Sequence, residues 1–141
     1  LCAGFYLWSF DRQAVSGFLV LLGVHTEDSE AEAKKIADKI CGLRIFHDEA
    51  GKMNRSVLDI GGEMLLVSNF TLLAAYKKGN RPDYMGAEKP EIASRMYDYF
   101  VEKLRESVSH VDTGVFGADM KVSLVNDGPV TITYDTDLWL G

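Results

Sequence analysis

The sequence lacks several features by which common classes of protein are identified. No apolar run among its 141 residues approaches the roughly 20 residues that a helix needs to cross a bilayer. Residues 1–10 are apolar, but they contain no basic segment and no small-residue cleavage site, so we do not interpret them as a signal peptide. There are two cysteines, Cys2 and Cys41, far apart and without metal-ligand spacing. Cys41 falls on a predicted helical stripe, and a buried thiol there fits a reducing cytoplasm.

The usual signatures of cofactor and metal chemistry are also missing. The chain has no metal-ligand cluster, no phosphate-binding Walker loop, no dinucleotide fingerprint and no Gly-x-Ser-x-Gly elbow. Its three histidines are scattered through turn regions with no nucleophile nearby in sequence, which favours surface imidazoles. The sequence therefore predicts no cofactor and no metal.

Basic residues are fewer than acidic ones. Fifteen basic residues against 21 acidic ones give a net charge of −6. General repulsion opposes the binding of a bulk polyanion to such a protein, so any contact with nucleic acid needs a local basic patch. Lys77, Lys78 and Arg81 form the one good candidate, although charged residues in such a run are also typical of a solvated loop.

The apolar patterns that are present predict one α+β domain over residues 1–141, with more strands than helices and a mixed or antiparallel sheet. A helix with an apolar stripe is expected at 33–41, and a second one begins at Pro90 with its stripe at Ile92, Met96, Tyr99, Phe100 and Leu104. Strands are expected at 18–24, 43–46, 63–70, 120–124 and 130–134.

Two stretches carry polar or unusual chemistry at strand ends. Ser68, Asn69, Phe70 and Thr71 close the strand at 63–70, beside a long polar loop at 74–89. Their hydroxyls are candidates for a nucleophile, an orienting group or a local hydrogen-bonder, and their backbone N–H groups are candidates for an oxyanion hole. The segment Gly128-Pro129, between the last two expected strands, is either a turn or a functional close approach.

Four segments, in this order, resemble the D-aminoacyl-tRNA deacylase family. They are Ser-Asn-Phe-Thr-Leu at 68–72, Lys-Lys-Gly-Asn-Arg-Pro at 77–82, Phe-Gly-Ala-Asp-Met at 116–120 and Asn-Asp-Gly-Pro-Val-Thr at 126–131. The segments at 19–24, 43–46 and 51–54 are also similar to that family, and the resemblance covers residues 15–135.

The resemblance implies a deacylase-like fold and a cytoplasmic homodimer, with no membrane association. The implied activity is hydrolysis of the ester between a D-amino acid and tRNA, and glycyl-tRNA is a second expected substrate because a pocket that excludes L side chains admits glycine. The implied chiral filter is the peptide between Gly128 and Pro129, which in the family is cis and projects into the partner subunit's active site.

The resemblance also assigns expected roles to the other residues. Ser68, Asn69, Phe70 and Thr71 are expected to line the catalytic pocket and supply backbone donors. Phe116, Ala118 and Met120 are expected near the terminal adenosine, and Lys77, Lys78 and Arg81 at tRNA phosphates. For hydrolysis itself, Thr71 is one candidate nucleophile and the 2′-hydroxyl of the terminal ribose is the other. We favour the ribose, because nothing in the sequence supplies a base for Thr71.

The chain departs from the family pattern in three places. Asn69 stands where the family has Gln, and Leu73 stands where a Tyr or similar residue is usual. Residues 1–13 resemble neither the strand containing Gln-Arg-Val nor the hairpin with which family members open, and Arg12 has no clear counterpart there. A lost first strand would leave a sheet edge exposed. Two other classes of function therefore stay in competition: a nucleic-acid-binding module without catalysis, and a degenerate paralogue that only dimerises.

Overall fold

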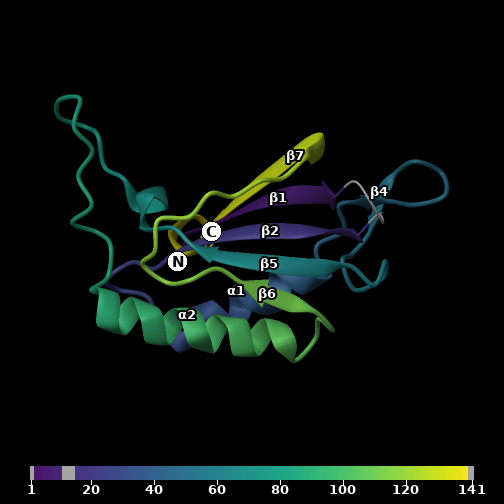
Figure 1. Cartoon of the computed structure of the whole chain (residues 1–141), viewed down its shortest axis with the longest axis horizontal. Coiled ribbons are helices and arrows are strands. Elements are labelled where there is room, and N and C mark those ends of the chain that lie inside the picture. Colours follow the sequence, from purple (N-terminus) through teal and green to yellow (C-terminus); the bar gives the residue numbers. More distant parts are fainter. Residues whose placement is uncertain (1, 11–14, 140–141) are drawn as a thin grey trace.

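A five-stranded mixed sheet carries two long helices on one face (Figure 1). The computed structural model describes residues 2–10 and 15–139. In the sheet the strands lie in the order β6-β5-β2-β1-β7, with β2 parallel to β5, β5 parallel to β6, and β1 antiparallel to both β2 and β7. The elements, in chain order, are β1 Cys2–Phe10, β2 Val15–Gly23, α1 Glu30–Gly42, β3 Phe46–His47, β4 Met53–Arg55, β5 Glu63–Ser68, the 3₁₀ helix η1 Phe70–Leu73, α2 Pro90–Arg105, β6 Val111–Thr113, β7 Asn126–Asp135 and α3 Thr136–Trp139.

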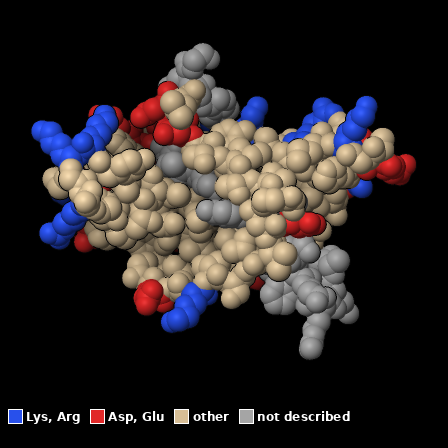
Figure 2. Space-filling model, turned by 90° about the horizontal axis from the view of Figure 1, so that it is seen from above, with Lys and Arg blue, Asp and Glu red and all other residues tan. Residues whose placement is uncertain are grey.

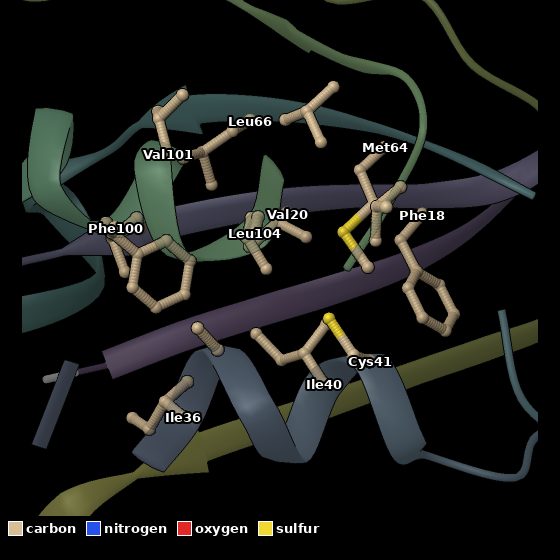
Figure 3. Close-up of a cluster of buried hydrophobic side chains, with 14 of the residues drawn as sticks. Phe18, Val20, Ile36, Ile40, Cys41, Met64, Leu66, Phe100, Val101 and Leu104 are labelled. Carbon is tan, nitrogen blue, oxygen red and sulfur yellow. The ribbon is translucent and has the colours of Figure 1, made fainter. Parts of the chain in front are cut away.

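The core lies between this sheet and helices α1 and α2 (Figure 3). Alternate residues of β2 point into it: Phe18, Val20 and Leu22 are at most 2% exposed. They meet Ile36 and Ile40 of α1 in the same apolar cluster. The predicted α+β class, with a mixed sheet and two main helices, is confirmed.

Helix α1 forms where its sequence predicts it. Ser29 is the N-cap, and its side chain pairs with Glu32 in a reciprocal capping box that satisfies the first free N–H groups. All five residues of the predicted stripe are buried: Ala33, Ile36, Ala37, Ile40 and Cys41. Burial raises the pKa of the Cys41 thiol to about 11, so this thiol stays protonated and unreactive at neutral pH.

Helix α2 begins with Pro90 at its first turn, as predicted, but its buried face is displaced from the predicted stripe. Ile92 is 41% exposed. Phe100 and Leu104 are fully buried as expected. The other buried positions are Ala93, Tyr97 and Val101, so the face is centred one residue further along the helix.

The structure corrects four expectations about strands. The strand expected at 43–46 is instead the two-residue strand β3 at Phe46–His47. Cys2–Phe10 forms β1, which pairs with β2 on one side and β7 on the other, so the first strand is present and central. Arg12 lies outside the described residues. Residues 120–124 are not a strand, and Gly128-Pro129 lies inside β7 rather than between two strands. Val111–Thr113, which the sequence pattern did not predict, extends the sheet as β6.

Replacing Phe100 by Ala tests whether this core sets the stability of the chain. The ring is 0% exposed, so its removal leaves a cavity and should lower the free energy of unfolding by about 3–5 kcal/mol. Ile92→Ala, on the same helix but 41% exposed, is the matched control and should cost less than about 1 kcal/mol. Chemical denaturation midpoints of the two variants provide the measurement. Equal losses would contradict the observed orientation of α2.

Candidate active site

A cleft of about 1030 Å³ opens where β5 ends and the 3₁₀ helix η1 begins. Its floor includes Leu19 and Leu21, the β2 residues that alternate with the core-facing ones. The cleft brings together two of the sequence-predicted groups. These are Ser68, Asn69, Phe70 and Thr71 on one side, and Phe116, Ala118 and Met120 on the other.

Strand pairing positions the first group. Ser68 is opposite Leu22 in the parallel β2–β5 ladder, and the Asn69 N–H donates to the Leu22 carbonyl at 2.8 Å. The Asn69 side chain then caps η1: its amide oxygen accepts from the N–H and from the hydroxyl of Thr71. Gly23 leaves space for this turn, since a Cβ there would lie 3.1 Å from the Asn69 carbonyl oxygen.

Among the described residues, the Thr71 hydroxyl makes no hydrogen bond to a carboxylate or an imidazole. It donates to the amide oxygen of Asn69, and an amide oxygen does not take up a proton at neutral pH. Among the described residues, no histidine lines the cleft. Two carboxylates do: Asp119, and Glu88, which accepts from the N–H of Lys89 at 2.7 Å. The N–H of Phe70 is the first of η1 and has no acceptor within that helix, which makes it a candidate donor to a ligand.

The second wall is held by Tyr97, which sequence reasoning missed. Its hydroxyl donates to the Leu66 carbonyl at 2.8 Å, and the N–H of Gly114 donates to the same oxygen. The Tyr97 ring meets Phe116 edge-on with 5.8 Å between centroids. Tyr97 thus ties the wall segment to the end of β5. Its position on the buried face of α2 was the available signal, but the predicted stripe contained Tyr99 instead.

Gly128 and Pro129 do not line this cleft. The peptide bond between them is cis, and Gly128 has a φ of 129°, where an added Cβ would lie 2.9 Å from a methyl of Val130. The Asn126 side chain spans the pair: its oxygen accepts from the Val130 N–H and its nitrogen donates to Thr131, both at 3.0 Å.

Strand register places Gly128-Pro129 at the far end of the sheet. Asn126 is opposite Trp8, Trp8 is opposite Gly17, and Gly17 is opposite Glu63, the first residue of β5. The cleft is built on Ser68, the last residue of β5. The structure therefore keeps this pair of residues away from the cleft of its own chain.

Lys77, Lys78 and Arg81 are exposed in the loop between η1 and α2, which extends away from the sheet (Figure 1). Lys and Arg side chains lie at this end of the molecule in Figure 2, and others lie at the opposite end. In the described part of the chain, none of the three forms an ion pair, no group of side chains is suited to hold a metal ion, and no helix is long and apolar enough to cross a membrane.

The sequence is similar to a known family over most of its length. A family model described as D-Tyr-tRNA(Tyr) deacylase matches residues 10–135. The chain is 55% identical over 121 residues to the D-aminoacyl-tRNA deacylase of Thermus aquaticus, which covers 86% of this chain and 80% of that protein. It is 52% identical over 120 residues to the D-aminoacyl-tRNA deacylase of Bacillus cereus strain B4264, covering 85% and 82%.

Solved structures have the same fold. The c-Myc DNA Unwinding Element Binding Protein aligns with a TM-score of 0.86 at 36% identity, covering 96% of this chain and 99% of that one. A probable eukaryotic D-amino acid tRNA deacylase aligns with a TM-score of 0.76 over 94% and 97% of the two chains. At 13% identity, the second comparison supports the fold alone.

Replacing Tyr97 by Phe tests the link between α2 and the cleft wall. Loss of its hydrogen bond should lower the free energy of unfolding by about 1 kcal/mol at neutral pH. Burial raises the pKa of Tyr97 to about 12, above the ordinary value of 10. The folded state therefore disfavours ionisation, so the Tyr97 contribution is complete below pH 10 and is lost as the pH rises through 12.

Denaturation curves of the wild type and Tyr97→Phe at several values of pH provide the measurement. The stability advantage of the wild type should shrink between pH 10 and pH 12, the tyrosine value and the raised value of Tyr97. Ile92→Ala, which removes an exposed side chain without a titratable group from the same helix, is the control and should show no such trend. A pH-independent difference for Tyr97→Phe would contradict the assignment.

Proposed function

Because the chain belongs to the D-Tyr-tRNA(Tyr) deacylase family, we propose that it hydrolyses the ester between a D-amino acid and the 3′ end of tRNA, releasing the free amino acid and the tRNA. One observation carries this proposal. Residues 68–71 and 116–120, from segments that resemble the family in sequence, line a single cleft although more than 40 residues separate them.

The cleft offers a place for the terminal adenosine and its ester. Phe116, Ala118 and Met120 contribute the apolar surface against which the nucleoside lies. The N–H of Phe70 donates to the ester carbonyl oxygen as negative charge develops on it. Since the Thr71 hydroxyl is paired with an amide oxygen, the ribose 2′-hydroxyl assists the attack of water on the carbonyl carbon. The new bond to the water oxygen replaces the ester bond to the ribose oxygen, and a proton of the water passes through the 2′-hydroxyl to that departing oxygen, which leaves free amino acid and tRNA.

Chirality is checked by a second copy of the chain. Gly128 and Pro129 lie at the far end of the sheet from Ser68, so they reach a cleft only if it belongs to another subunit. A two-fold homodimer gives each cleft the Gly128-Pro129 pair of the other subunit. Their carbonyl groups leave no room for an L side chain, whereas a D residue or glycine is accepted.

Charge and compartment fit an RNA substrate. Lys77, Lys78 and Arg81 bind phosphates of the tRNA, which reconciles the net charge of −6 with a polyanionic substrate. We place the protein in the cytoplasm, where aminoacyl-tRNA is used and where the buried Cys41 stays reduced.

The direct test follows ester loss from one tRNA charged with D- or L-tyrosine. The wild type should release D-tyrosine rapidly and leave the L ester at the buffer rate. Gly128→Val should lose at least about tenfold in rate on the D ester, corresponding to about 1.4 kcal/mol of transition-state stabilisation. Asp127→Ala, at the neighbouring exposed position, is the control and should hydrolyse the D ester at the wild-type rate. Equal hydrolysis of both esters by the wild type would contradict the proposal that Gly128-Pro129 acts as a chiral filter.

Mixing two inactive variants tests the shared site. Ala118→Trp blocks the cleft of its own subunit, and Gly128→Val places a side chain at the cleft of the partner subunit, so each variant alone loses most of its activity on the D ester. In a mixed dimer, the open cleft of the Gly128→Val subunit meets the intact Gly128-Pro129 of its partner, so an equal mixture should recover about a quarter of wild-type activity. No recovery from mixed dimers would place both elements in one chain and contradict the proposal.

The two candidate catalytic groups are separated by removing each hydroxyl in turn. Thr71→Val keeps the shape of the side chain, and its rate should stay within about tenfold of the wild type because the Thr71 hydroxyl is paired with an amide oxygen. A D-tyrosyl-tRNA that ends in 2′-deoxyadenosine should react at least about a hundredfold more slowly. The opposite pattern would make Thr71 the nucleophile.

One solved structure favours a second candidate function, nucleic-acid binding without catalysis. The c-Myc DNA Unwinding Element Binding Protein, 36% identical to this chain, is named for a DNA target. A binding module would keep its affinity for nucleic acid after Gly128→Val, would depend on Lys77, Lys78 and Arg81, and would leave both tyrosyl esters intact.

A further inference from the structure

The two arms of the loop between η1 and α2 are joined by backbone hydrogen bonds into a short antiparallel ribbon. Ala75 and Asp83 form an antiparallel bridge in which each N–H donates to the other carbonyl at 2.8 Å. The Asp83 carboxylate also accepts from the N–H of Met85 at 2.7 Å. Residues 76–82 form the tip of this ribbon, which extends beyond the sheet in Figure 1.

Aromatic side chains line the path from the cleft to this tip. Phe70 is 57% exposed and Tyr84 is 36% exposed, and their rings meet edge-on at 5.0 Å between centroids. Both residues line the mouth of the cleft. Tyr76, next to the bridge on the other arm, is 75% exposed. Large rings left in water beside a cleft mark a surface that another molecule covers.

Positive charge lies immediately beside these rings. Lys77, Lys78 and Arg81 are all exposed at the tip and form no ion pair within the described residues, although the whole chain is acidic. Exposed aromatic rings interleaved with unpaired cations are the pattern of a single-stranded nucleic acid site, where bases stack on rings and phosphates meet cations. A duplex would use the cations but not the rings.

We propose that Phe70, Tyr84 and Tyr76 form a stacking surface for the unpaired nucleotides that precede the terminal adenosine of the tRNA, with Lys77, Lys78 and Arg81 at their phosphates. This inference rests on the proposed deacylase function for the identity of the RNA. In this arrangement the protein binds the tRNA mainly through its single-stranded 3′ end. The ester of a lone adenosine would occupy the cleft without touching Tyr76.

Tyr76 is the residue to vary, because it does not line the cleft. A fluorescent single-stranded RNA ending in CCA is the probe for binding. Tyr76→Ala should weaken its binding by roughly fivefold or more, the loss of about one stacked base. Tyr76→Trp should bind as well as the wild type, and Tyr76→Leu should not, since only a ring can stack. Met85→Ala, 85% exposed in the same loop, is the matched control and should change nothing.

Hydrolysis gives an independent readout. Tyr76→Ala should raise the KM for D-tyrosyl-tRNA by a similar factor relative to the KM for D-tyrosyl-adenosine. If the wild type binds the RNA but cleaves neither ester, the deacylase proposal is contradicted and the stacking surface is not. Equal RNA binding by wild type and Tyr76→Ala, or parallel losses on both esters, would overturn the stacking surface. So would a smaller mass of Tyr76→Ala in sedimentation, because the rings would then belong to contacts between subunits.

Discussion

The burial of β2 on both faces is the constraint on which the structure depends. Phe18, Val20 and Leu22 pack under the helices, while Leu19 and Leu21, which alternate with them, form the floor of the cleft. A shift of one residue in the pairing with β5 would exchange these two sets and expose the core residues in the cleft. The same ladder fixes Ser68 opposite Leu22, so the register that forms the core also positions the segment that we propose to be catalytic.

Strand direction separates the two parts of the proposed active site. β5 runs toward the cleft and ends there, whereas β7 is antiparallel to β1 and begins at the opposite end of the sheet. Gly128-Pro129 at the start of β7 and Ser68 at the end of β5 are therefore kept apart by the fold that each chain needs for its own stability. In the proposed enzyme, association of two chains is part of building the site, and it makes the chiral filter a property of the dimer.

Local patterns predicted most of the fold where one periodicity was clear. The α1 stripe followed from a single apolar face, and β2 from a continuous apolar run. The α2 stripe was displaced because apolar residues occupy neighbouring positions, so sequence alone could not choose between Tyr97 and Tyr99. β1 and β6 were missed because their place depends on partners distant in sequence. For the same reason, the meeting of residues 68–71 with 116–120 was expected only from the family resemblance.

Asn69 stands where the sequence resemblance implies a Gln, and this difference bears on how the proposed site works. The shorter side chain reaches only the next turn, where its oxygen accepts from both the N–H and the hydroxyl of Thr71. Because those two donors occupy the amide oxygen, Asn69 shapes η1 and is not left to accept from a substrate. The same contacts keep the Thr71 hydroxyl turned toward an amide. In the proposed mechanism, catalysis therefore relies on groups that the capped turn leaves unpaired, chiefly the backbone N–H of Phe70 and the 2′-hydroxyl of the substrate.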